Sequence, residues 1–247
     1  MRTAIVSPTY NERENVEWFL RNVREQLPNA HIFIVDDNSP DGTGVEADRL
    51  TAEISEVTVV HRATKDGLGS AYRHGFDVAR AAGYEMIVSM DVDRSHDPSV
   101  LPALVGAVND GADIAIGSRY VPGGGTANWP LHRRLLSAWG NRYTAFVVGL
   151  QVHDCTSAYR AYRATALEAI DPSSTRADGY AFLTELMRRA ARSGLTVAEV
   201  PIVFVDRQYG KSKMSGRIVV ESMLLVTAWG VRDRLHRLKS LLARRRA

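Results

Sequence analysis

The feature that most constrains the fold is a regular alternation of short apolar runs with helix-sized segments over the first 120 residues. The apolar runs have the length of strands, and the segments between them have the apolar spacing of helices. The strand candidates are Thr3–Ser7, His31–Val35, Val57–His61, Glu85–Met90 and Asp113–Gly117. The helix candidates between them are Val16–Gln26, Gly44–Glu53, Gly69–Ala82 and Pro98–Asp110. Such alternation predicts an α/β fold, in which a mostly parallel central sheet carries helices on both faces.

Length and composition bound the class of protein further. The chain has 247 residues, of which 45% are hydrophobic and 24% charged, so it can bury the core of one large domain or of a compact domain with a tail. Its single cysteine, Cys155, excludes an internal disulfide and fits a reducing compartment. The longest apolar candidate, residues 218–231, contains Glu221 and is shorter than the roughly 20 residues that span a bilayer. The chain opens on a strand-like run without a signal peptide, so we expect a cytoplasmic protein, soluble or peripherally bound to a membrane.

Polar, glycine-rich or acidic segments follow all five strand candidates. In parallel α/β sheets ligands bind beyond the carboxyl ends of the strands, so these segments predict one extended binding site. In chain order the segments are Pro8–Glu12, Asp36–Thr43, Lys65–Gly69, Asp91–Asp93 and Gly117–Tyr120.

The strongest single signal is the sequence Asp91-Val92-Asp93, which follows the apolar run at 86–90. In extended backbone, residues two apart point the same way, so both carboxylates can face one cation. Oxygen ligands at a strand end suit Mg²⁺ or Mn²⁺, which commonly bridge substrate phosphates. The alternative is an acidic turn whose aspartates cap the next helix. The position of the pattern at the end of a buried strand favours the metal site.

Two earlier segments are candidates for nucleoside binding. Asp36 and Asp37 end a buried strand, where a carboxylate can accept hydrogen bonds from a nucleobase or a ribose. Turn and cap formers follow them, so we expect one of these aspartates to be functional and Asp41 to be structural. In the first segment, Tyr10 and Glu12 can hold a base by stacking and edge recognition, or the segment can simply begin a helix. The local sequence leaves both interpretations open.

Other nucleotide-binding and catalytic motifs do not occur. The glycine pair of Gly67-Leu68-Gly69 continues to Tyr72 rather than to a third glycine, and Gly210-Lys211-Ser212 lacks the first glycine of a phosphate-binding loop. No serine–histidine pair forms a nucleophile elbow, and the seven histidines have no zinc-binding spacing. We interpret His96 and His153 as structural or supporting groups.

The second half of the chain carries scattered cations beside predicted loops and helix starts. Each one alone is most often a solvated surface charge. Several that converge on one cleft would serve two phosphoryl groups, those of a leaving diphosphate and of an anionic acceptor. These candidates are Arg119, Arg133, Arg134, Arg207, Lys211 and Lys213.

Taken together, these segments resemble the polyprenyl-phosphate mannosyltransferases, also called dolichol-phosphate mannose synthases, of glycosyltransferase family 2. The likeness runs in order from about residue 3 to residue 213. Beyond the five segments after the strands, it includes Ser70 to Tyr72, Arg94 to His96, Asp-Cys-Thr-Ser-Ala-Tyr-Arg (154–160), Gly-Tyr-Ala-Phe-Leu-Thr-Glu (179–185) and Arg-Gln-Tyr-Gly-Lys-Ser-Lys (207–213). The family's Thr-Ser-Gly-Phe-Arg is Thr-Ser-Ala-Tyr-Arg in this chain.

The resemblance implies a GT-A fold, a nucleotide-sugar donor, Mg²⁺ or Mn²⁺, and inversion at the anomeric carbon. It implies that Asp93 is a direct metal ligand, and Ser95 occupies the next ligand position, where relatives can have glutamine. The residues that it implies for the nucleotide sugar are Pro8, Tyr10, Glu12, Val35, Asp37, Asp91, Val92, Asp93, Arg119, Arg207 and Lys213. Those that it implies for the acceptor phosphate are Arg119, Arg133 and Ser137.

The activity implied by the resemblance is transfer of mannose from GDP-mannose to a polyprenyl monophosphate. The acceptor is already anionic at pH 7, so it needs no general base. Catalysis would then rest on alignment and on neutralising the departing diphosphate, with the catalytic residues Asp91, Asp93, Arg119, Arg207 and Lys213. The alternatives are transfer of glucose or another sugar from a UDP-sugar, nucleotidyl transfer, and a nucleotide-sensing or scaffold role.

The C-terminal segment, residues 214–247, is basic and contains apolar residues at helical spacing. We expect it to form amphipathic helices that follow a catalytic domain at residues 1–213. Such helices can lie on anionic lipid, or they can pack on their own domain with a solvated basic face. The expected partners are the nucleotide sugar, the lipid acceptor and the cytoplasmic face of a membrane, with a separate membrane-anchoring subunit as an option and no nucleic acid.

Overall fold

The computed structural model describes residues 1–177, 179–206 and 216–244. Its strands are β1 (Thr3–Thr9), β2 (His31–Asp36), β3 (Val57–His61), β4 (Met86–Ser89), β5 (Ile114–Ser118), β6 (Gly125–Ala127), β7 (Arg160–Arg163), β8 (Val197–Pro201) and β9 (Val203–Val205). Its α-helices are α1 (Arg13–Gln26), α2 (Thr43–Thr51), α3 (Leu68–Ala81), α4 (Leu101–Asn109), α5 (Leu131–Val148), α6 (Ala164–Ile170), α7 (Gly179–Arg192) and α8 (Gly216–Arg244). The strands and helices predicted for the first 120 residues are confirmed, with ends that shift by a few residues.

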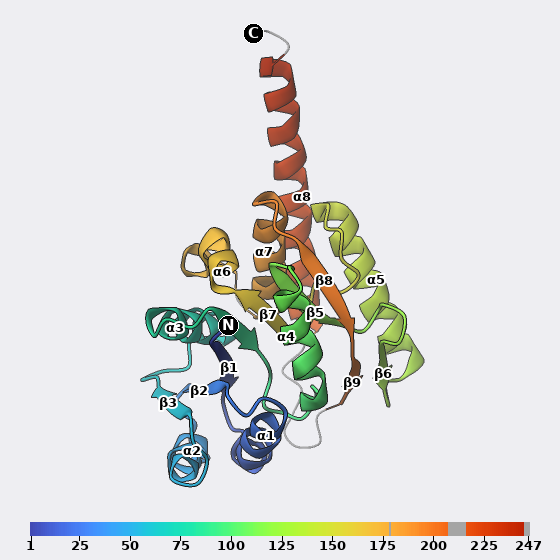
Figure 1. Cartoon of the computed structure of the whole chain (residues 1–247). Coiled ribbons are helices and arrows are strands. Elements are labelled where there is room, and N and C mark those ends of the chain that lie inside the picture. The colour runs from blue at the N-terminus through green and yellow to red at the C-terminus, as the bar shows by residue number, and fades with distance from the viewer. Residues whose placement is uncertain (178, 207–215, 245–247) are drawn as a thin grey trace.

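A seven-stranded sheet in the order β3-β2-β1-β4-β7-β5-β8 forms the centre of the molecule (Figure 1). β7 runs antiparallel to its neighbours β4 and β5, and the other neighbouring pairs are parallel. The predicted mostly parallel sheet is therefore confirmed. The parallel strands end on one edge, which brings the segments after β1, β2, β4 and β5 together.

Two apolar cores lie on opposite faces of this sheet. One core packs α1, α2 and α4 on the sheet, through residues such as Phe19, Leu50 and Leu104. The other core packs α3, α6 and α7, and it includes Phe76 and Phe182. Apolar residues cover both faces of the strands, which explains why the strand segments read as continuous apolar runs.

A small parallel pair, β6 and β9, extends the structure beside the main sheet. β6 follows a tight turn in which a Cβ on Gly124 would lie 2.5 Å from the carbonyl oxygen of Ser118, so only glycine fits there. α5 begins just after β6, and β9 ends at Val205. The pair therefore positions the start of α5 next to the carboxyl ends of the main strands.

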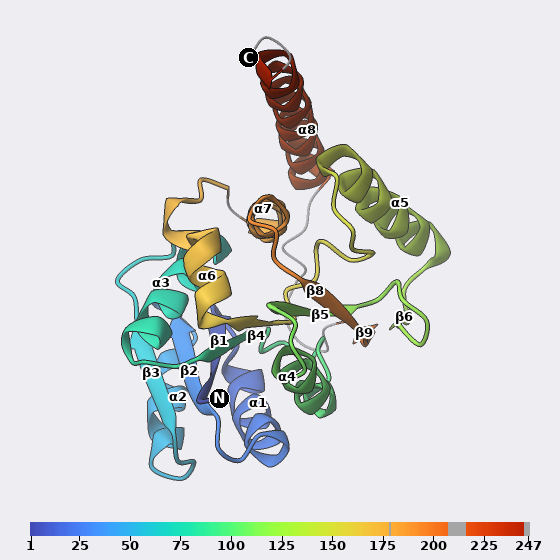
Figure 2. The same ribbon diagram turned by 45° about the horizontal axis from the view of Figure 1, so that its top comes forward.

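The described part of the C-terminal segment, Gly216–Arg244, forms one continuous helix, α8, where the sequence predicted amphipathic helices. Its first half packs on α5, where a Cβ on Gly230 would lie 2.4 Å from Val147 Cγ1, and Tyr143 Oη lies 2.7 Å from Thr227 Oγ1. Its far half projects from the body of the protein (Figures 1 and 2). Within the described part of the chain, no helix combines the length and apolar character needed to cross a bilayer. The division at residue 213 stays a prediction.

Candidate active site

A cavity of about 240 Å³ lies at the carboxyl ends of the central strands. One side of it is polar and comes from the segments after β4 and β5, with further polar residues from α5, from the loop before β7 and from the position after β9. The other side is largely apolar and comes mainly from α5 and α8. The polar wall includes Asp91, Asp93, Ser95, His96, Arg119, Arg133, Ser137, Thr156, Ser157 and Asp206. The apolar wall includes Trp129, Leu136, Trp139, Phe204, Met223 and Val226.

The turn after β4 holds the two aspartates of the Asp91-Val92-Asp93 motif. Asp91 Oδ1 accepts a hydrogen bond from Tyr72 Oη at 3.0 Å, and Asp93 Oδ1 accepts one from the backbone N–H of Ser95 at 3.1 Å. Arg94, between Asp93 and Ser95, adopts a left-handed conformation with φ of 63°, which a residue with a side chain adopts at a cost. The turn is thus a constrained one that directs both carboxylates toward the cavity.

His96 supports this turn from behind. Its Nδ1 accepts the backbone N–H of Asp91 at 3.2 Å, so the ring carries its proton on Nε2. The imidazole is buried and stacks on Tyr159, with ring centroids 4.8 Å apart. Burial lowers the pKa of His96, which keeps the ring neutral. These contacts match the supporting role inferred from the sequence.

The donors in this turn fit a hard divalent cation. Asp91, Asp93 and Ser95 all line the cavity. The Ser95 hydroxyl is buried and has no hydrogen-bond partner among the described residues, as expected of an oxygen that serves as a ligand. No cluster of three or more His, Cys, Asp and Glu side chains occurs in the described ranges. A site with so few protein ligands suits Mg²⁺ or Mn²⁺, which complete their shell with water and phosphate oxygens.

The residues predicted to hold the nucleoside lie at the ends of β1 and β2. Pro8 pairs with Val35 across the two strands, and Val35 is fully buried, so the role predicted for Val35 stays a prediction. Tyr10 lies at the surface end of β1, with the Lys65 ammonium 3.7 Å from its ring centroid. The Glu12 carboxylate accepts a hydrogen bond from Asn15 Nδ2 at 2.8 Å.

Asp37 is buried beside Arg62, whose guanidinium forms a hydrogen-bonded ion pair with it. Arg62 also donates to Ser70 Oγ at 2.6 Å. Burial raises the pKa of Asp37, and the positive charge of Arg62 offsets part of that rise. The arrangement holds one carboxylate oxygen next to a cation at the edge of the sheet, where a nucleobase can exchange hydrogen bonds with both groups.

Arg62 and Lys65 are two residues beside the predicted nucleoside site for which the sequence predicts no role. Lys65 opens one of the polar segments after the strands, so its position was a usable signal. Arg62 immediately follows β3 and carries no motif of its own. Its contact with Asp37 depends on pairing between β2 and β3, which the sequence does not specify.

Asp36 and Asp41 have structural roles, as expected for Asp41. Asp36 accepts hydrogen bonds from Thr9 Oγ1 at 3.0 Å and from the backbone N–H of Ser39 at 3.0 Å. Asp41 accepts from the backbone N–H and hydroxyl of Thr43, where α2 begins. These contacts brace the loop, whereas Asp37 pairs with Arg62 instead, and its role in nucleoside binding stays a prediction.

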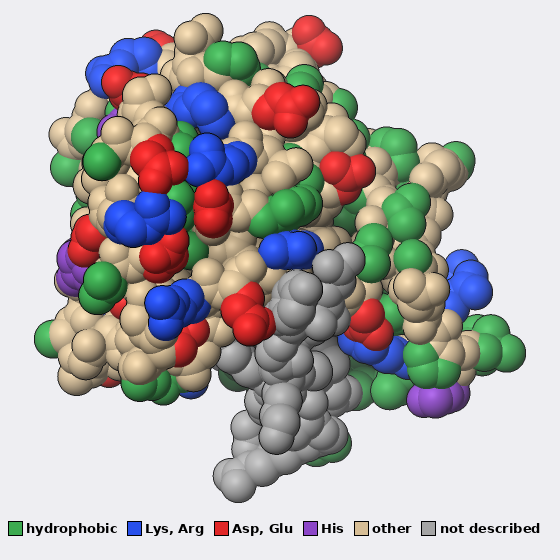
Figure 3. Space-filling view, turned by 90° about the horizontal axis from the view of Figure 1, so that it is seen from below, with side chains coloured by type: hydrophobic (Ala, Val, Ile, Leu, Met, Phe, Trp, Pro, Cys, Tyr) green, Lys and Arg blue, Asp and Glu red, His purple; other side chains and the backbone are tan. Residues whose placement is uncertain are grey.

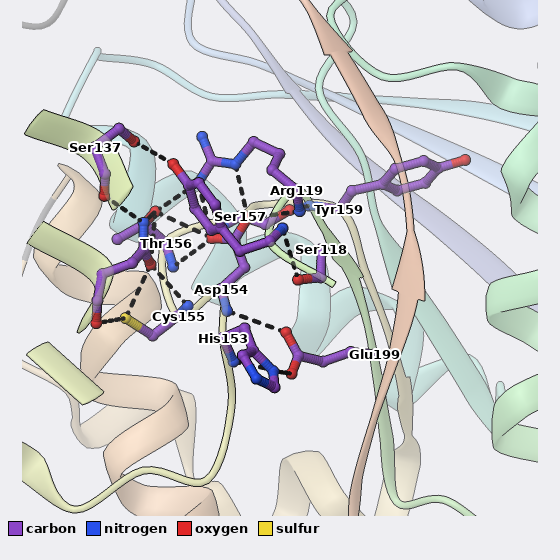
Figure 4. A network of polar contacts seen from close by, with 12 residues as sticks. Ser118, Arg119, Ser137, His153, Asp154, Cys155, Thr156, Ser157, Tyr159 and Glu199 are labelled. Atoms are coloured by element: carbon purple, nitrogen blue, oxygen red, sulfur yellow. Dashed lines mark hydrogen bonds and ion pairs between the residues drawn. The ribbon is translucent and has the colours of Figure 1, made fainter. Parts of the chain in front are cut away.

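Arg119 forms a buried ion pair with Asp154 (Figure 4). Its Nε and Nη2 donate to the two carboxylate oxygens at 2.7 and 2.8 Å, and Nη2 also donates to Thr156 Oγ1 at 2.8 Å. Burial by itself would raise the pKa of Asp154, but the charge and hydrogen bonds of Arg119 outweigh it and lower that pKa. The pair fixes the guanidinium at the cavity wall. In the sequence, Asp154 was only part of a segment that resembles the family. In the structure it positions the Arg119 guanidinium.

Arg133 and Ser137 lie on successive turns of α5. Arg133 Nη1 donates to both oxygens of Asp206 at 2.9 and 2.8 Å, and its guanidinium carbon lies 3.9 Å from the centroid of the Trp129 ring. Ser137 Oγ accepts a hydrogen bond from Tyr120 Oη at 2.7 Å. All three residues predicted for the acceptor phosphate, these two and Arg119, therefore line the same cavity as Asp91 and Asp93. Arg207 and Lys213 lie outside the described residues.

Chemically, the cavity combines a hard-cation donor set, fixed guanidinium groups and an apolar wall. The first two features suit a diphosphate and a second phosphoryl group. The described histidines near the turn are buried or braced, and no acid–base dyad faces the cavity in the described ranges. Such a site suits transfer between phosphorylated partners by positioning and charge neutralisation.

Comparison with proteins of known sequence agrees with this geometry. The chain is 49% identical to the polyprenol monophosphomannose synthase of Mycolicibacterium smegmatis, over 97% of this chain and 91% of that protein. It is 47% identical to the undecaprenyl-phosphate mannosyltransferase of Micrococcus luteus, over 98% of this chain and 99% of the relative.

Solved structures share the fold at lower identity. The glucosyl-3-phosphoglycerate synthase of Mycobacterium tuberculosis, in complex with Mn²⁺, UDP and glucosyl-3-phosphoglycerate, has a TM-score of 0.65 at 18% identity, over 92% of this chain and 80% of that one. A mannosyltransferase of Pyrobaculum calidifontis, in complex with GDP-Man and Mn²⁺, has a TM-score of 0.65 at 20% identity, over 94% and 64%. The predicted GT-A fold is confirmed.

A family model adds a direct match. The model described as glycosyl transferase family 2 covers residues 4–171, which include the turn with the paired aspartates and the segments after β1, β2 and β5. With the two bacterial relatives, this match places the cavity within a recognised enzyme scaffold. The chain is a glycosyltransferase that belongs to family 2 and, within it, to the polyprenyl-phosphate mannosyltransferase family.

Proposed function

We propose that the protein transfers mannose from GDP-mannose to a polyprenyl monophosphate with inversion at the anomeric carbon. The observation that carries the proposal is the two-sided cavity, in which Asp91 and Asp93 face an apolar wall from α5 and α8. A nucleotide sugar suits the polar side, and a lipid phosphate suits a cavity with an apolar exit. The mannosyl transfer and the polyprenyl acceptor are supported by the names of the two bacterial relatives.

Asp91, Asp93 and Ser95 would hold a divalent cation against the donor diphosphate. When bound, that cation supplies positive charge that stabilises the departing GDP. Tyr72 and His96 keep Asp91 in place through the hydrogen bonds described above, and the backbone N–H of Ser95 does the same for Asp93. The donor's nucleoside would occupy the edge formed by Pro8, Tyr10, Glu12, Val35 and Asp37, with Arg62 and Lys65 beside it.

The acceptor phosphate would be the nucleophile. One of its oxygens attacks C1 of mannose as the bond from C1 to the β-phosphate oxygen breaks, and GDP leaves with the bonding electrons. A phosphate monoester is anionic at pH 7, so the step requires no proton removal. Arg119, Arg133 and Ser137 would align the phosphate, while Arg207 and Lys213 would complete the clamp on the phosphates.

Location follows from the acceptor. We place the enzyme at the cytoplasmic face of the membrane that holds the polyprenyl phosphate, where the basic residues of the C-terminal segment would meet anionic lipid. A separate membrane-anchoring subunit would be compatible with this placement.

A competition assay tests the donor and the acceptor together. Labelled GDP-mannose and UDP-glucose are supplied at equal concentration with a short-chain polyprenyl phosphate and Mn²⁺ or Mg²⁺. We expect mannose in the lipid product and inhibition by GDP rather than UDP. Dominant glucose transfer, or inhibition by UDP alone, would exclude GDP-mannose and retain only the enzyme class.

The metal role has its own test. Asp93→Asn removes one ligand and one negative charge, so it should lower turnover by orders of magnitude, and excess chelator should do the same to the unaltered protein. Asp110→Asn is the matched control, because Asp110 is exposed at the end of α4 and should tolerate the change. Full turnover of the Asp93 variant, or full activity in chelator, would contradict the proposed metal site.

A further inference from the structure

Asn141 is a buried amide on α5, and it lines the active-site cavity. Its Oδ1 accepts a hydrogen bond from the backbone N–H of Cys155 at 3.0 Å. A backbone N–H can only donate, so this contact fixes which end of the amide carries the oxygen. Nδ2 then donates to the carbonyl oxygen of Ser137 at 3.1 Å and to Thr156 Oγ1 at 3.2 Å. Asn141 therefore uses both of its amide protons to join α5 to the loop before β7.

The hydroxyl of Thr156 can offer a ligand only its proton. Its oxygen accepts hydrogen bonds from Arg119 Nη2 at 2.8 Å and from Asn141 Nδ2 at 3.2 Å, which use its two lone pairs. The described acceptors for its own proton are Asp154 Oδ1 at 3.3 Å and Asn141 Oδ1 at 3.4 Å, both longer than an ordinary O–H···O hydrogen bond. Thr156 is partly exposed and lines the cavity. An atom that binds there closely must therefore accept a hydrogen bond.

Two further donors lie beside this hydroxyl (Figure 4). Ser137 Oγ accepts a hydrogen bond from Tyr120 Oη at 2.7 Å, and its own proton has no acceptor among the described residues. The Arg119 guanidinium is held by Asp154 through Nε and Nη2, and its Nη1 makes no hydrogen bond to a described residue. A guanidinium edge and two hydroxyl protons together suit a phosphate, whose oxygens only accept when it is ionised.

The charge around these donors also favours an anion. α5 contains three arginines, one histidine and no acidic residue. Asp154 and Asp206, the acidic partners on this side of the site, are engaged by Arg119 and Arg133. Figure 3 shows the same bias from below: acidic side chains gather mainly over the N-terminal half, whereas the lobe at the right, where β6 and the start of α5 lie, presents mostly hydrophobic, basic and histidine side chains.

We propose that the Thr156 hydroxyl is a further ligand of the acceptor phosphate and that Asn141 is its positioning residue. One phosphate oxygen would accept the Thr156 proton, while others would accept hydrogen bonds from Ser137 and Arg119. Asn141 is bonded to both hydroxyl-bearing residues, so it sets the spacing between α5 and the loop before β7. This inference rests on the proposed function, because it assigns these donors to the phosphate of the lipid acceptor.

The donor diphosphate is the other phosphate that the cavity would hold. It would lie against the turn after β4, which is braced by Tyr72, His96 and the backbone of Ser95. Thr156 is instead bonded to α5 through Asn141. α5 also supplies much of the apolar wall, along which the chain of a lipid acceptor would lie. The lipid phosphate is therefore the better match for the Thr156 hydroxyl.

The test compares Thr156→Val with Thr156→Ser in the full chain. Valine has the shape of threonine without the hydroxyl, whereas serine keeps the hydroxyl. Calorimetry in the presence of GDP and Mn²⁺ measures binding of a water-soluble short-chain polyprenyl phosphate. We expect Thr156→Val to weaken that binding about ten- to hundredfold, as for loss of a hydrogen bond to a charged group, and Thr156→Ser to stay within about threefold. GDP affinity in Mn²⁺ should change less than about twofold in both variants.

Asn141→Ala tests the positioning role. It should weaken acceptor binding through Thr156, so it should have little further effect when Thr156→Val is already present. In transfer assays it should raise the KM for the acceptor and leave the KM for the donor near normal. Asn22→Ala is the matched control, because Asn22 Nδ2 donates to the Trp18 carbonyl oxygen at 2.7 Å, the same bond to the fourth preceding residue, on α1. That control should leave acceptor binding unchanged, and thermal unfolding shows whether the variants remain folded.

The outcomes separate this proposal from the proposed function. Unchanged acceptor binding in Thr156→Val overturns the phosphate ligand, and so does weaker GDP binding with unchanged acceptor binding, because the hydroxyl would then serve the donor. Additive losses in the double variant overturn the positioning role of Asn141. If the wild-type protein binds the lipid phosphate but transfers no mannose to it, the proposed function is refuted and the Thr156 variants still decide the phosphate site. If the wild-type protein does not bind the lipid phosphate, both are refuted.

Discussion

Replacing Asp154 by asparagine is expected to have two effects. It should destabilise the fold, and it should displace the Arg119 guanidinium. The carboxylate is fully buried and Arg119 is only 8% exposed. Besides the two side-chain bonds from Arg119, Asp154 accepts the backbone N–H groups of Arg119, Thr156 and Ser157. Asparagine has nearly the same shape, so the substitution removes the negative charge and one acceptor oxygen without leaving a cavity.

The magnitude follows from the burial of the pair. Removing one partner of a buried ion pair leaves an uncompensated charge in a low-dielectric site, which costs about 3–5 kcal/mol. For a protein of this size, 1 kcal/mol corresponds to about 2–4 °C in melting temperature, so we expect a decrease of roughly 6–20 °C. A partial recovery should follow when Arg119→Met is added, because the stranded charge is then removed.

The pH dependence of stability provides an independent check that the ion pair between Arg119 and Asp154 stabilises the folded protein. The pKa of Asp154 is lower in the folded protein than its ordinary value. The pair therefore stabilises the fold above that ordinary pKa, near 3.9, and the contribution is lost as the pH falls through the folded value. The difference in stability between the wild-type protein and Asp154→Asn should be constant from pH 7 to about pH 5 and should narrow below about pH 4.

The assay is reversible unfolding in urea at several pH values, with circular dichroism as the readout. Glu17→Gln serves as the control, because Glu17 and its partner Arg21 are each about half exposed on α1 and should contribute nothing measurable. Equal free energies of unfolding for Asp154→Asn and the wild-type protein would refute the argument. If the difference in unfolding free energy between the two proteins grew toward low pH, the pKa of Asp154 would not be lowered by folding and the argument would be wrong.

Three further changes test the packing. Gly75→Ala should destabilise the protein by about 1–3 kcal/mol, because its Cβ would lie 2.4 Å from Val6 Cγ1; urea unfolding measures this. Gly230→Ala should loosen α8 from α5 at similar cost, because its Cβ would lie 2.5 Å from the Val147 carbonyl oxygen; faster proteolysis within α8 would report it. Burial raises the pKa of the Cys155 thiol to about 12, so a disulfide reagent at pH 8 should label it only in denaturant, and rapid labelling of the native protein would contradict its burial.

The central fold could be predicted because each strand is apolar and each helix amphipathic in the local sequence. β7 could not, because its four residues, Arg160–Arg163, include two arginines. Arg160 is nonetheless fully buried and donates to the carbonyl oxygens of Cys155 and Leu183. Cys155 lies in the loop just before the strand and Leu183 lies 23 residues further along the chain, so hydropathy read along the sequence cannot anticipate a buried arginine in the middle of the sheet.

The candidate site likewise has features that the sequence predicts and features that it does not. The carboxyl ends of parallel strands meet at one edge, so the position of the polar segments was predictable from the strand pattern alone. The partners of individual side chains were not. Arg62 reaches Asp37 through pairing of β2 and β3, and Arg133 reaches Asp206 because β6 and β9 lie together. These contacts join residues that are 25 and 73 positions apart in the chain.

The charges of the cavity lead to an expectation about donor binding. In the described part of the site, Arg119 is balanced by Asp154, and Arg133 by Asp206. Asp91 and Asp93 add negative charge where a diphosphate would lie. Two like unit charges 4 Å apart repel by about 4 kcal/mol at an effective dielectric constant of 20, so each carboxylate opposes a diphosphate oxygen placed beside it.

A bound divalent cation would convert that repulsion into attraction, and GDP and the cation should therefore bind cooperatively. Titration calorimetry without acceptor measures this directly. We expect GDP to bind at least about tenfold more tightly with saturating Mn²⁺ than in chelator, and Asp93→Asn to remove most of the difference. The coupling is reciprocal, so GDP should raise the affinity for Mn²⁺ by the same factor. Equal GDP affinity in Mn²⁺ and in chelator would show that other groups neutralise the diphosphate and that the paired aspartates have a different purpose.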